Sequence, residues 1–357
     1  MPDGVYLRPT GLLHGQTARV ATAHGKAGWL AGGPLAFSLC EVIEGEPGRA
    51  KRRIAAYGEL AAARERAITV ALERITHARD PLAGLSLDRP RIMGVVNVTP
   101  DSFSDGGLHN TTEAAIAHGA ALAAQGADIL DIGGESTRPG SDAIDAAREA
   151  TRILPVIEGL QGVGAVISAD SRKSDVMRRA AETGAHILND VSALTFDEES
   201  LSVAVACGLP VVLMHAQGDP KTMQDSPAYE DVVLEVFDFL EMRIGMCEAA
   251  GLSRARIIVD PGIGFGKTLE HNLALLEAIS LFHSLGTAIL VGVSRKRFIG
   301  TLTGEDEPRK RLAGSLAAGL AAVAQGVQIL RVHDVRETVN AVAVWRAATN
   351  GSSTGLV

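Results

Sequence analysis

The chain is poor in cysteine, in aromatic residues and in positive charge. Its 357 residues include three cysteines, Cys40, Cys207 and Cys247, without the cysteine and histidine spacings typical of metal sites. An odd number of cysteines in a long chain favours a reducing compartment, and we interpret all three as small core residues. The formal net charge of −8 and the lack of a basic stripe interleaved with aromatic residues predict no nucleic-acid partner.

Long apolar runs of the kind that cross membranes are also lacking. The most apolar stretch, residues 316–330, is interrupted by glycine and glutamine, which is typical of a buried helix that leads into a strand. The N-terminal residues show no charged segment followed by an apolar core, so we expect no secretory signal. These features predict a cytoplasmic protein with no membrane partner. Hydrophobic residues make up 46% of the chain, which is enough for a large core.

What the chain has in abundance is a repeated unit. In most copies a glycine closes a helix, a short apolar strand follows, and a polar residue stands at the end of that strand. Strands are predicted at residues 92–96, 126–131, 164–170, 184–189, 208–215, 256–260, 289–294 and 326–331. Eight strands that alternate with helices over roughly 250 residues predict an α/β fold, the (β/α)8 or TIM barrel. The active site of such a barrel lies at the C-terminal ends of its strands.

Residues 1–88 do not follow this rhythm, and we predict that they form a separate N-terminal α/β extension. Isolated short strands are expected at residues 5–8 and 34–42. Apolar residues spaced by three and four predict one helix at about residues 53–79, stopped by Pro81. A basic cluster at residues 49–53 fits a solvated helix start better than contact with an acidic surface. We expect the barrel at residues 89–350 and a tail at 351–357, and we assign no chemistry to the extension.

Polar side chains stand at the ends of the predicted barrel strands. The acidic and amide groups, which suit a ligand rich in ring N–H and amino donors, are Asp131, Asp170, Asn189 and Asp260. Any one of them could be a satisfied core group, but four at equivalent strand ends favour a ligand site. The cationic groups, which suit phosphate oxygens, are Arg138, Lys296, Arg331 and His333. The predicted site therefore carries both signs of charge.

Two familiar kinds of site are not supported. The sequence Gly266-Lys267-Thr268 follows a strand and imitates the end of a phosphate-binding loop, but Pro261 occupies the position of the first glycine. No His-x-His follows a strand, and neither His215 nor His333 has a ligand partner at a recognisable spacing. The sequence therefore favours neither nucleotide hydrolysis nor a zinc hydrolase.

A set of motifs occurs in order between about Ile92 and Trp345. They are MGVVNVTPDSFSDGG, DIGGESTRPG, Asp170-Ser171, ILNDVSAL, VLMHAQGDPKTMQ, VDPGIGFGKTLEHN, VGVSRKRFIG and RVHDV. Together they resemble the dihydropteroate synthases of folate biosynthesis, a family of pterin-binding TIM barrels. The resemblance implies a transferase that joins 7,8-dihydropterin-6-ylmethyl diphosphate to 4-aminobenzoate and releases diphosphate. It also implies Mg²⁺ as cofactor, a homodimer, and competition by sulfonamide-type analogues of 4-aminobenzoate.

The resemblance further implies roles for single residues. Asn97 matches the metal ligand, and the pterin contacts match Asp170, Asn189, Asp260 and Lys296, with Met214 as the floor of the pocket. The residues on the diphosphate side match Thr137, Arg331 and His333, and those on the aminobenzoate side match Arg138, Phe265 and Ser294. The implied catalytic residues are Asn97, Arg138, Lys296, Arg331 and His333. A loop with Asp101, Phe103 and Asp105 is expected to shield the reaction from water.

Small departures from the family pattern and two alternatives remain. Ser171 stands where threonine is common, and Ala216 stands where methionine is common, but neither position carries the implied chemistry. The alternatives are a catalytically silent pterin-binding or regulatory relative and a pterin-dependent methyltransferase barrel. The paired loops TPDSFSDGG and ESTRPG favour the synthase over the methyltransferase, and the complete cationic set argues against a silent relative.

Overall fold

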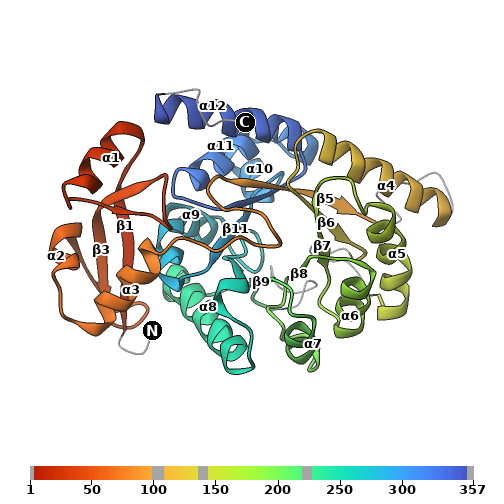
Figure 1. Ribbon diagram of the computed structural model, residues 1–357, viewed down its shortest axis with the longest axis horizontal. Coiled ribbons are helices and arrows are strands. Elements are labelled where there is room, and N and C mark those ends of the chain that lie inside the picture. Colours follow the sequence, from red (N-terminus) through yellow and green to blue (C-terminus); the bar gives the residue numbers. More distant parts are fainter. Residues whose placement is uncertain (1–3, 99–107, 136–143, 219–226, 352–357) are drawn as a thin grey trace.

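A closed barrel of eight parallel strands forms most of the molecule in the computed structural model, which describes residues 4–98, 108–135, 144–218 and 227–351 (Figure 1). The strands are β5 (Arg91–Asn97), β6 (Ile129–Gly133), β7 (Val166–Asp170), β8 (Ile187–Asp190), β9 (Val211–Met214), β10 (Ile257–Asp260), β11 (Ala288–Gly292) and β12 (Ile329–Val332). Neighbours in the chain are neighbours in the barrel, and β12 closes it by pairing with β5. The predicted fold class and all eight predicted strands are therefore confirmed.

Helices cover the outside of the barrel. They are α4 (Leu108–Ala124), α5 (Ala146–Gly159), α6 (Ser174–Thr183), α7 (Ser200–Cys207), α8 (Val232–Ala249), α9 (Leu269–Glu277), α10 (Arg297–Thr303), α11 (Leu312–Val323) and α12 (Val335–Asn350), with a 3-10 helix η3 (Ile279–Leu285) before β11. Gly184 and Gly208 end α6 and α7 in the left-handed conformation, as the repeated unit predicts. Within the described residues, no helix is long and apolar enough to cross a membrane.

The inside of the barrel has an apolar end and a polar end. At the N-terminal ends of the strands, the interior is filled by Met93, Ile129, Ile187, Val212, Ile258, Leu290 and Ile329. Residues 82–87, here called the plug, cover this end with Leu82, Leu85 and Leu87. Since the apolar layer and the plug close one end, polar side chains gather at the other, where the C-terminal ends of the strands lie.

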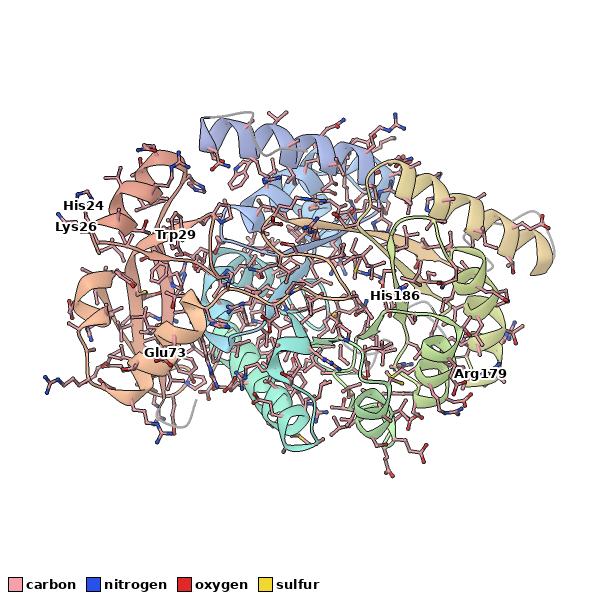
Figure 2. The ribbon with its side chains drawn as sticks, in the orientation of Figure 1. His24, Lys26, Trp29, Glu73, Arg179 and His186 are labelled. Carbon is pink, nitrogen blue, oxygen red and sulfur yellow. The ribbon has the colours of Figure 1, made fainter. Side chains whose placement is uncertain are left out.

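The extension is a four-stranded antiparallel sheet with three helices. Its elements are β1 (Val5–Leu13), α1 (Gly15–Ala23), β2 (Gly28–Trp29), β3 (Ala36–Glu44), β4 (Lys51–Ala56), α2 (Tyr57–Ala61) and α3 (Arg66–Thr76). The two strands expected to be isolated pair with each other as β1 and β3, and β3 is also bonded to β2 and β4. The first strand is longer than predicted, and the second begins and ends two residues later. Figure 2 shows His24 and Lys26 of the extension at the opposite end of the molecule from Arg179 of α6.

The prediction of a single helix at residues 53–79 is wrong. Residues 51–56 form β4, and the rest divides into α2 and α3, with α3 ending at Thr76. The reason is that Ile54 fits the helical spacing only by coincidence: its side chain is 59% exposed, while Ala55 is buried beside β3. Pairing with β3 therefore overrides the local helical pattern.

One face of the extension's sheet packs on the outside of the barrel. Tyr6 and Ile43 belong to the same core as the barrel strands and their helices. The Tyr6 ring stands edge-on to Phe237 of α8 at 5.3 Å, and its hydroxyl donates to the Asp238 carboxylate at 2.8 Å. Ser280 of η3 donates its hydroxyl to the Pro9 carbonyl at 2.8 Å. The extension thus continues the packing of the barrel instead of standing apart from it.

Candidate functional site

The centre of the site is Asp131, a fully buried carboxylate inside the barrel on β6. Its oxygens accept hydrogen bonds from the Ser168 hydroxyl at 2.6 Å and from the Asn189 amide at 3.1 and 3.2 Å. A third donor, Nε of Arg331, lies 2.6 Å away. Side chains from four strands, β6, β7, β8 and β12, therefore meet at one carboxylate.

Arg331 links this carboxylate to a second one. Its Nη2 donates to the Asp170 carboxylate at 2.8 Å, so the guanidinium bridges Asp131 and Asp170. Burial disfavours the charge on Arg331, but the two carboxylates outweigh burial and raise its pKa. Burial, and then the neighbouring Asp131, raise the pKa of Asp170 to about 8 although Arg331 opposes the shift.

A second group of site residues lies at the end of β10 and in the loops that follow β10 and β11. The Asp260 carboxylate accepts from the Gly262 backbone N–H at 2.7 Å, and burial raises the pKa of Asp260. Lys296 donates to the Ile263 carbonyl, and its Nζ lies 4.5 Å from the centre of the Phe265 ring. Burial lowers the pKa of Lys296 to about 8. Lysine and phenylalanine therefore stack next to a buried carboxylate.

The remaining predicted residues stand around these two groups. The Ser294 hydroxyl lies 3.0 Å from Nδ1 of His333 and accepts from the His333 backbone N–H at 3.2 Å. Met214, which is buried, ends β9 beside Asp260. Asn97 ends β5 and is half-buried. The strand ends thus bring together every predicted site residue that the structure describes. Those outside the described residues are Asp101, Phe103, Asp105, Thr137 and Arg138.

Reasoning from the sequence missed several polar residues around the site. Ser168 could have been found, because it stands two residues before Asp170 and so shares the inward face of β7. Lys267 was weighed only as part of a phosphate-binding loop, yet it is buried, and burial lowers its pKa to about 7. A further buried network joins Glu135 to Lys173 at 2.9 Å, and Lys173 also donates to Glu149. Nothing in the spacing of these three residues reveals their contact.

The raised pKa of Asp170 predicts how the contribution of this residue to the free energy of unfolding depends on pH. Because this pKa is raised above its ordinary value of 3.8, folded Asp170 binds a proton that the unfolded chain has lost between about pH 4 and pH 8. Its contribution to stability is complete below pH 4 and falls as the pH rises. Relative to the parent, Asp170→Asn should therefore gain up to roughly 1 kcal/mol of unfolding free energy per pH unit in this window. Urea unfolding of both proteins at several pH values checks this, and a constant difference would contradict it.

Comparison with known proteins agrees with this site. A family model described as "Pterin binding enzyme" matches residues 93–333. Dihydropteroate synthase of Escherichia coli is 47% identical over 264 residues, which are 74% of this chain and 93% of that protein. The solved Xanthomonas albilineans dihydropteroate synthase with 4-aminobenzoic acid is 51% identical, covers 76% of this chain and 97% of its own, and superposes with a TM-score of 0.71.

A solved relative also carries an inhibitor. The Yersinia pestis dihydropteroate synthase in a sulfonamide drug complex is 44% identical and covers 74% of this chain and 96% of its own, with a TM-score of 0.70. A barrel with this set of polar strand ends and this family match is a pterin-binding enzyme. Within that class, the chain belongs to the dihydropteroate synthase family.

Proposed function

We propose that the chain condenses 7,8-dihydropterin-6-ylmethyl diphosphate with 4-aminobenzoate to give 7,8-dihydropteroate and diphosphate. The observation that carries this proposal is the Asp131–Arg331–Asp170 bridge beside the Asp260 and Lys296 pair, at the polar end of an apolar barrel. Such a site offers acceptors to a pterin ring and a cation to a diphosphate. Sulfonamide-type analogues should compete with 4-aminobenzoate, since a solved relative holds such a drug.

Recognition of the pterin follows from the directions of the hydrogen bonds. The amide nitrogen of Asn189 donates to the two carboxylate oxygens of Asp131, at 3.1 and 3.2 Å. The side-chain carbonyl oxygen of Asn189 can therefore accept from a ligand. Asp170 and Asp260 add carboxyl oxygens from strands on different sides of the barrel. Together these acceptors suit the ring N–H and amino groups of a pterin.

The reaction then needs stabilisation of a leaving anion. The bond between the pterin's exocyclic carbon and the diphosphate oxygen breaks, and its electron pair leaves with diphosphate. Within the described residues, Nη1 of Arg331 has no hydrogen-bond acceptor, so this nitrogen can bind the departing diphosphate together with His333. The amino group of 4-aminobenzoate attacks the carbon, forms the new C–N bond and loses a proton to water. An aryl amine is a neutral nucleophile at pH 7, so no general base is required.

The metal of this reaction is proposed as Mg²⁺ held by Asn97. Among the described residues, no group of three or more histidine, cysteine or acidic side chains could hold a metal ion. Mg²⁺ keeps several waters and takes few protein ligands besides substrate phosphates, so a single carboxamide oxygen at the end of β5 fits it. When bound, the ion would neutralise charge on the diphosphate.

The proposed activity is tested by measuring diphosphate release with both substrates and Mg²⁺. We expect release by the parent only when the pterin diphosphate and 4-aminobenzoate are both present. Asp260→Asn should lower kcat/KM for the pterin diphosphate on the order of tenfold or more, because a charge-assisted bond is worth roughly 1.5–3 kcal/mol. A parent that binds the pterin but releases no diphosphate would instead be the silent relative. Methyl transfer from a methylated pterin would identify the methyltransferase.

We also propose that the chain is a cytoplasmic homodimer. The dimer is supported by α11, whose sequence LAGSLAAGLAAV has no charged residue. Leu312, Leu316 and Leu320 are only partly buried, and Ala317 between them is exposed. An apolar strip of this kind on a surface helix is typical of an interface between subunits. The cytoplasm is supported by the three free cysteines.

The dimer proposal predicts a matched pair of results. Ala317→Glu places a charge in the apolar strip and should convert the dimer into a monomer, because burying an unpaired carboxylate at an interface is costly. Ala117→Glu, at an exposed alanine on α4, makes the same chemical change away from the strip and should leave the dimer intact. Sedimentation velocity distinguishes the two outcomes. A dimer that persists in Ala317→Glu would exclude this face as the interface.

A further inference from the structure

Lys267 is a buried lysine whose direct hydrogen bonds go to neutral groups, while the nearby Asp260 carboxylate favours its charged form. It is 3% exposed, and within the described residues it forms no ion pair. Its Nζ lies 2.9 Å from Nδ1 of His215, 3.3 Å from the His215 carbonyl oxygen and 2.9 Å from the Phe265 carbonyl oxygen. An ammonium has three N–H groups, and each one has an acceptor here. Burying a cation costs free energy. The presence of a lysine at this position therefore indicates that its hydrogen bonds have a structural role.

The protonation of His215 fits this arrangement. Since an ammonium only donates, Nδ1 of His215 has to accept, and the ring proton resides on Nε2. Burial and the neighbouring Lys267 lower the pKa of His215 to about 3, so the ring is neutral at physiological pH. The ring stands edge-on to Phe239 of α8 at 4.9 Å. His215 is therefore a fixed acceptor anchored against α8.

Lys267 lies at a seam between two loops. One loop is formed by residues 261–267 and is here called the β10 loop. Its backbone packs closely against residues 215–217, which follow β9. A Cβ added to Gly262 would lie 1.8 Å from the His215 carbonyl oxygen, and one added to Gly266 would lie 2.5 Å from the Gln217 carbonyl oxygen. Only glycine allows so close an approach, and both residues have positive φ angles. The lysine side chain bonds both sides of this seam.

Phe265 stands on the site side of the β10 loop. Its ring lies under Lys296, 4.5 Å from Nζ, while its carbonyl oxygen accepts from Lys267. Its backbone N–H donates to the Gly262 carbonyl at 3.1 Å. The backbone of Phe265 is thus held through Lys267. Two of the pterin acceptors, Asp170 and Asn189, are held by other groups, through Arg331 and Asp131. The other two pterin contacts, Asp260 and Lys296, bond the β10 loop at Gly262 and Ile263, whose backbones Lys267 does not bond.

We propose that Lys267 is a positioning residue that fixes Phe265 on the 4-aminobenzoate side of the site by tying the β10 loop to His215. This inference rests on the proposed function, in which Phe265 contacts 4-aminobenzoate. Its consequence is selective: loss of the lysine disturbs the second substrate more than the pterin.

The test compares the two KM values of Lys267→Met, which keeps an unbranched side chain only one atom shorter and removes all three donors. We expect the KM for 4-aminobenzoate to rise roughly tenfold. The KM for the pterin diphosphate should rise at most about threefold, since two of its four contacts, Asp170 and Asn189, do not bond the β10 loop. Lys267→Arg, which restores donors, should recover part of the loss. Ile258→Val in the apolar end of the barrel controls for lost stability and should change neither KM.

A second variant keeps the inference testable if Lys267→Met does not fold. His215→Phe retains an aromatic ring against Phe239 and removes both ring nitrogens, among them the Nδ1 acceptor, so the KM for 4-aminobenzoate should rise severalfold in the same selective way. Unchanged KM values, or equal increases for both substrates, overturn the inference while the parent's activity stands. A parent without diphosphate release overturns the proposed function, and this inference with it.

Discussion

Asp131→Ala is expected to bind the pterin substrate at least about 100-fold more weakly than the parent, which corresponds to roughly 2.7 kcal/mol. The side chain supports the site from beneath, because it accepts from Ser168, Asn189 and Arg331 at 2.6 to 3.2 Å. Without it, Arg331 keeps its ion pair with Asp170, and the Asn189 amide loses the acceptor that fixes its direction. Breaking one side of a buried ion pair costs about 3–5 kcal/mol, so stability should fall as well.

Isothermal titration calorimetry with the pterin diphosphate, in the absence of 4-aminobenzoate, measures this loss. Ser168→Ala is the matched control, because it removes one neutral donor to the same carboxylate at 2.6 Å and leaves both ion pairs of Arg331 in place. We expect it to cost on the order of 1 kcal/mol of stability and to change pterin affinity little. Equal affinities in Asp131→Ala and the parent would show that Asn189 and Arg331 are held without the carboxylate.

The barrel could be predicted because its signal is local and repeated. Each strand is a short apolar segment that ends in a polar residue, as in Ile257–Asp260, and the strand is buried on both faces. In the extension the same local reasoning failed at residues 51–56, where pairing with β3 decides the structure. Such pairing is a contact between segments, and no periodicity within one segment contains it.

The residues that form the site could be predicted from the sequence, but which of them bond to one another could not. A parallel barrel brings strand ends together, so Asp170, Asp260 and Arg331 were expected to be neighbours. That Asp131 lies beneath the others and bridges them through Arg331 depends on side-chain directions across 200 residues of chain. Lys267 received no role from the sequence for the same reason, since its partners His215 and Phe265 are identified only by the packing of two loops.

The contacts of the plug place the boundary between extension and barrel before residue 82, whereas the sequence predicted it at residue 88. The boundary predicted at residue 88 assigns Leu82, Leu85 and Leu87 to the extension, although these residues cover the apolar end of the barrel. The plug is also fastened to the first barrel strand, because Arg91 donates to the Ser86 carbonyl and to the Asp88 carboxylate. Residues 82–88 therefore belong to the barrel in their contacts, although they precede its first strand.

Two truncations that differ by only eight residues should consequently behave differently. Both the deletion of residues 1–80 and the deletion of residues 1–88 remove the sheet of the extension and its contact with α8, so that loss is common to both. Only the longer deletion uncovers Met93, Ile258 and their neighbours at the apolar end. Full burial of one leucine side chain is worth about 1.5–3 kcal/mol. Leu82 is buried and Leu85 and Leu87 are partly buried, so the longer deletion should be less stable by roughly 3 kcal/mol. Urea unfolding of the two proteins measures the difference. Equal unfolding free energies would mean that residues 82–88 add nothing to the barrel, and that the boundary predicted from the sequence is the physical one.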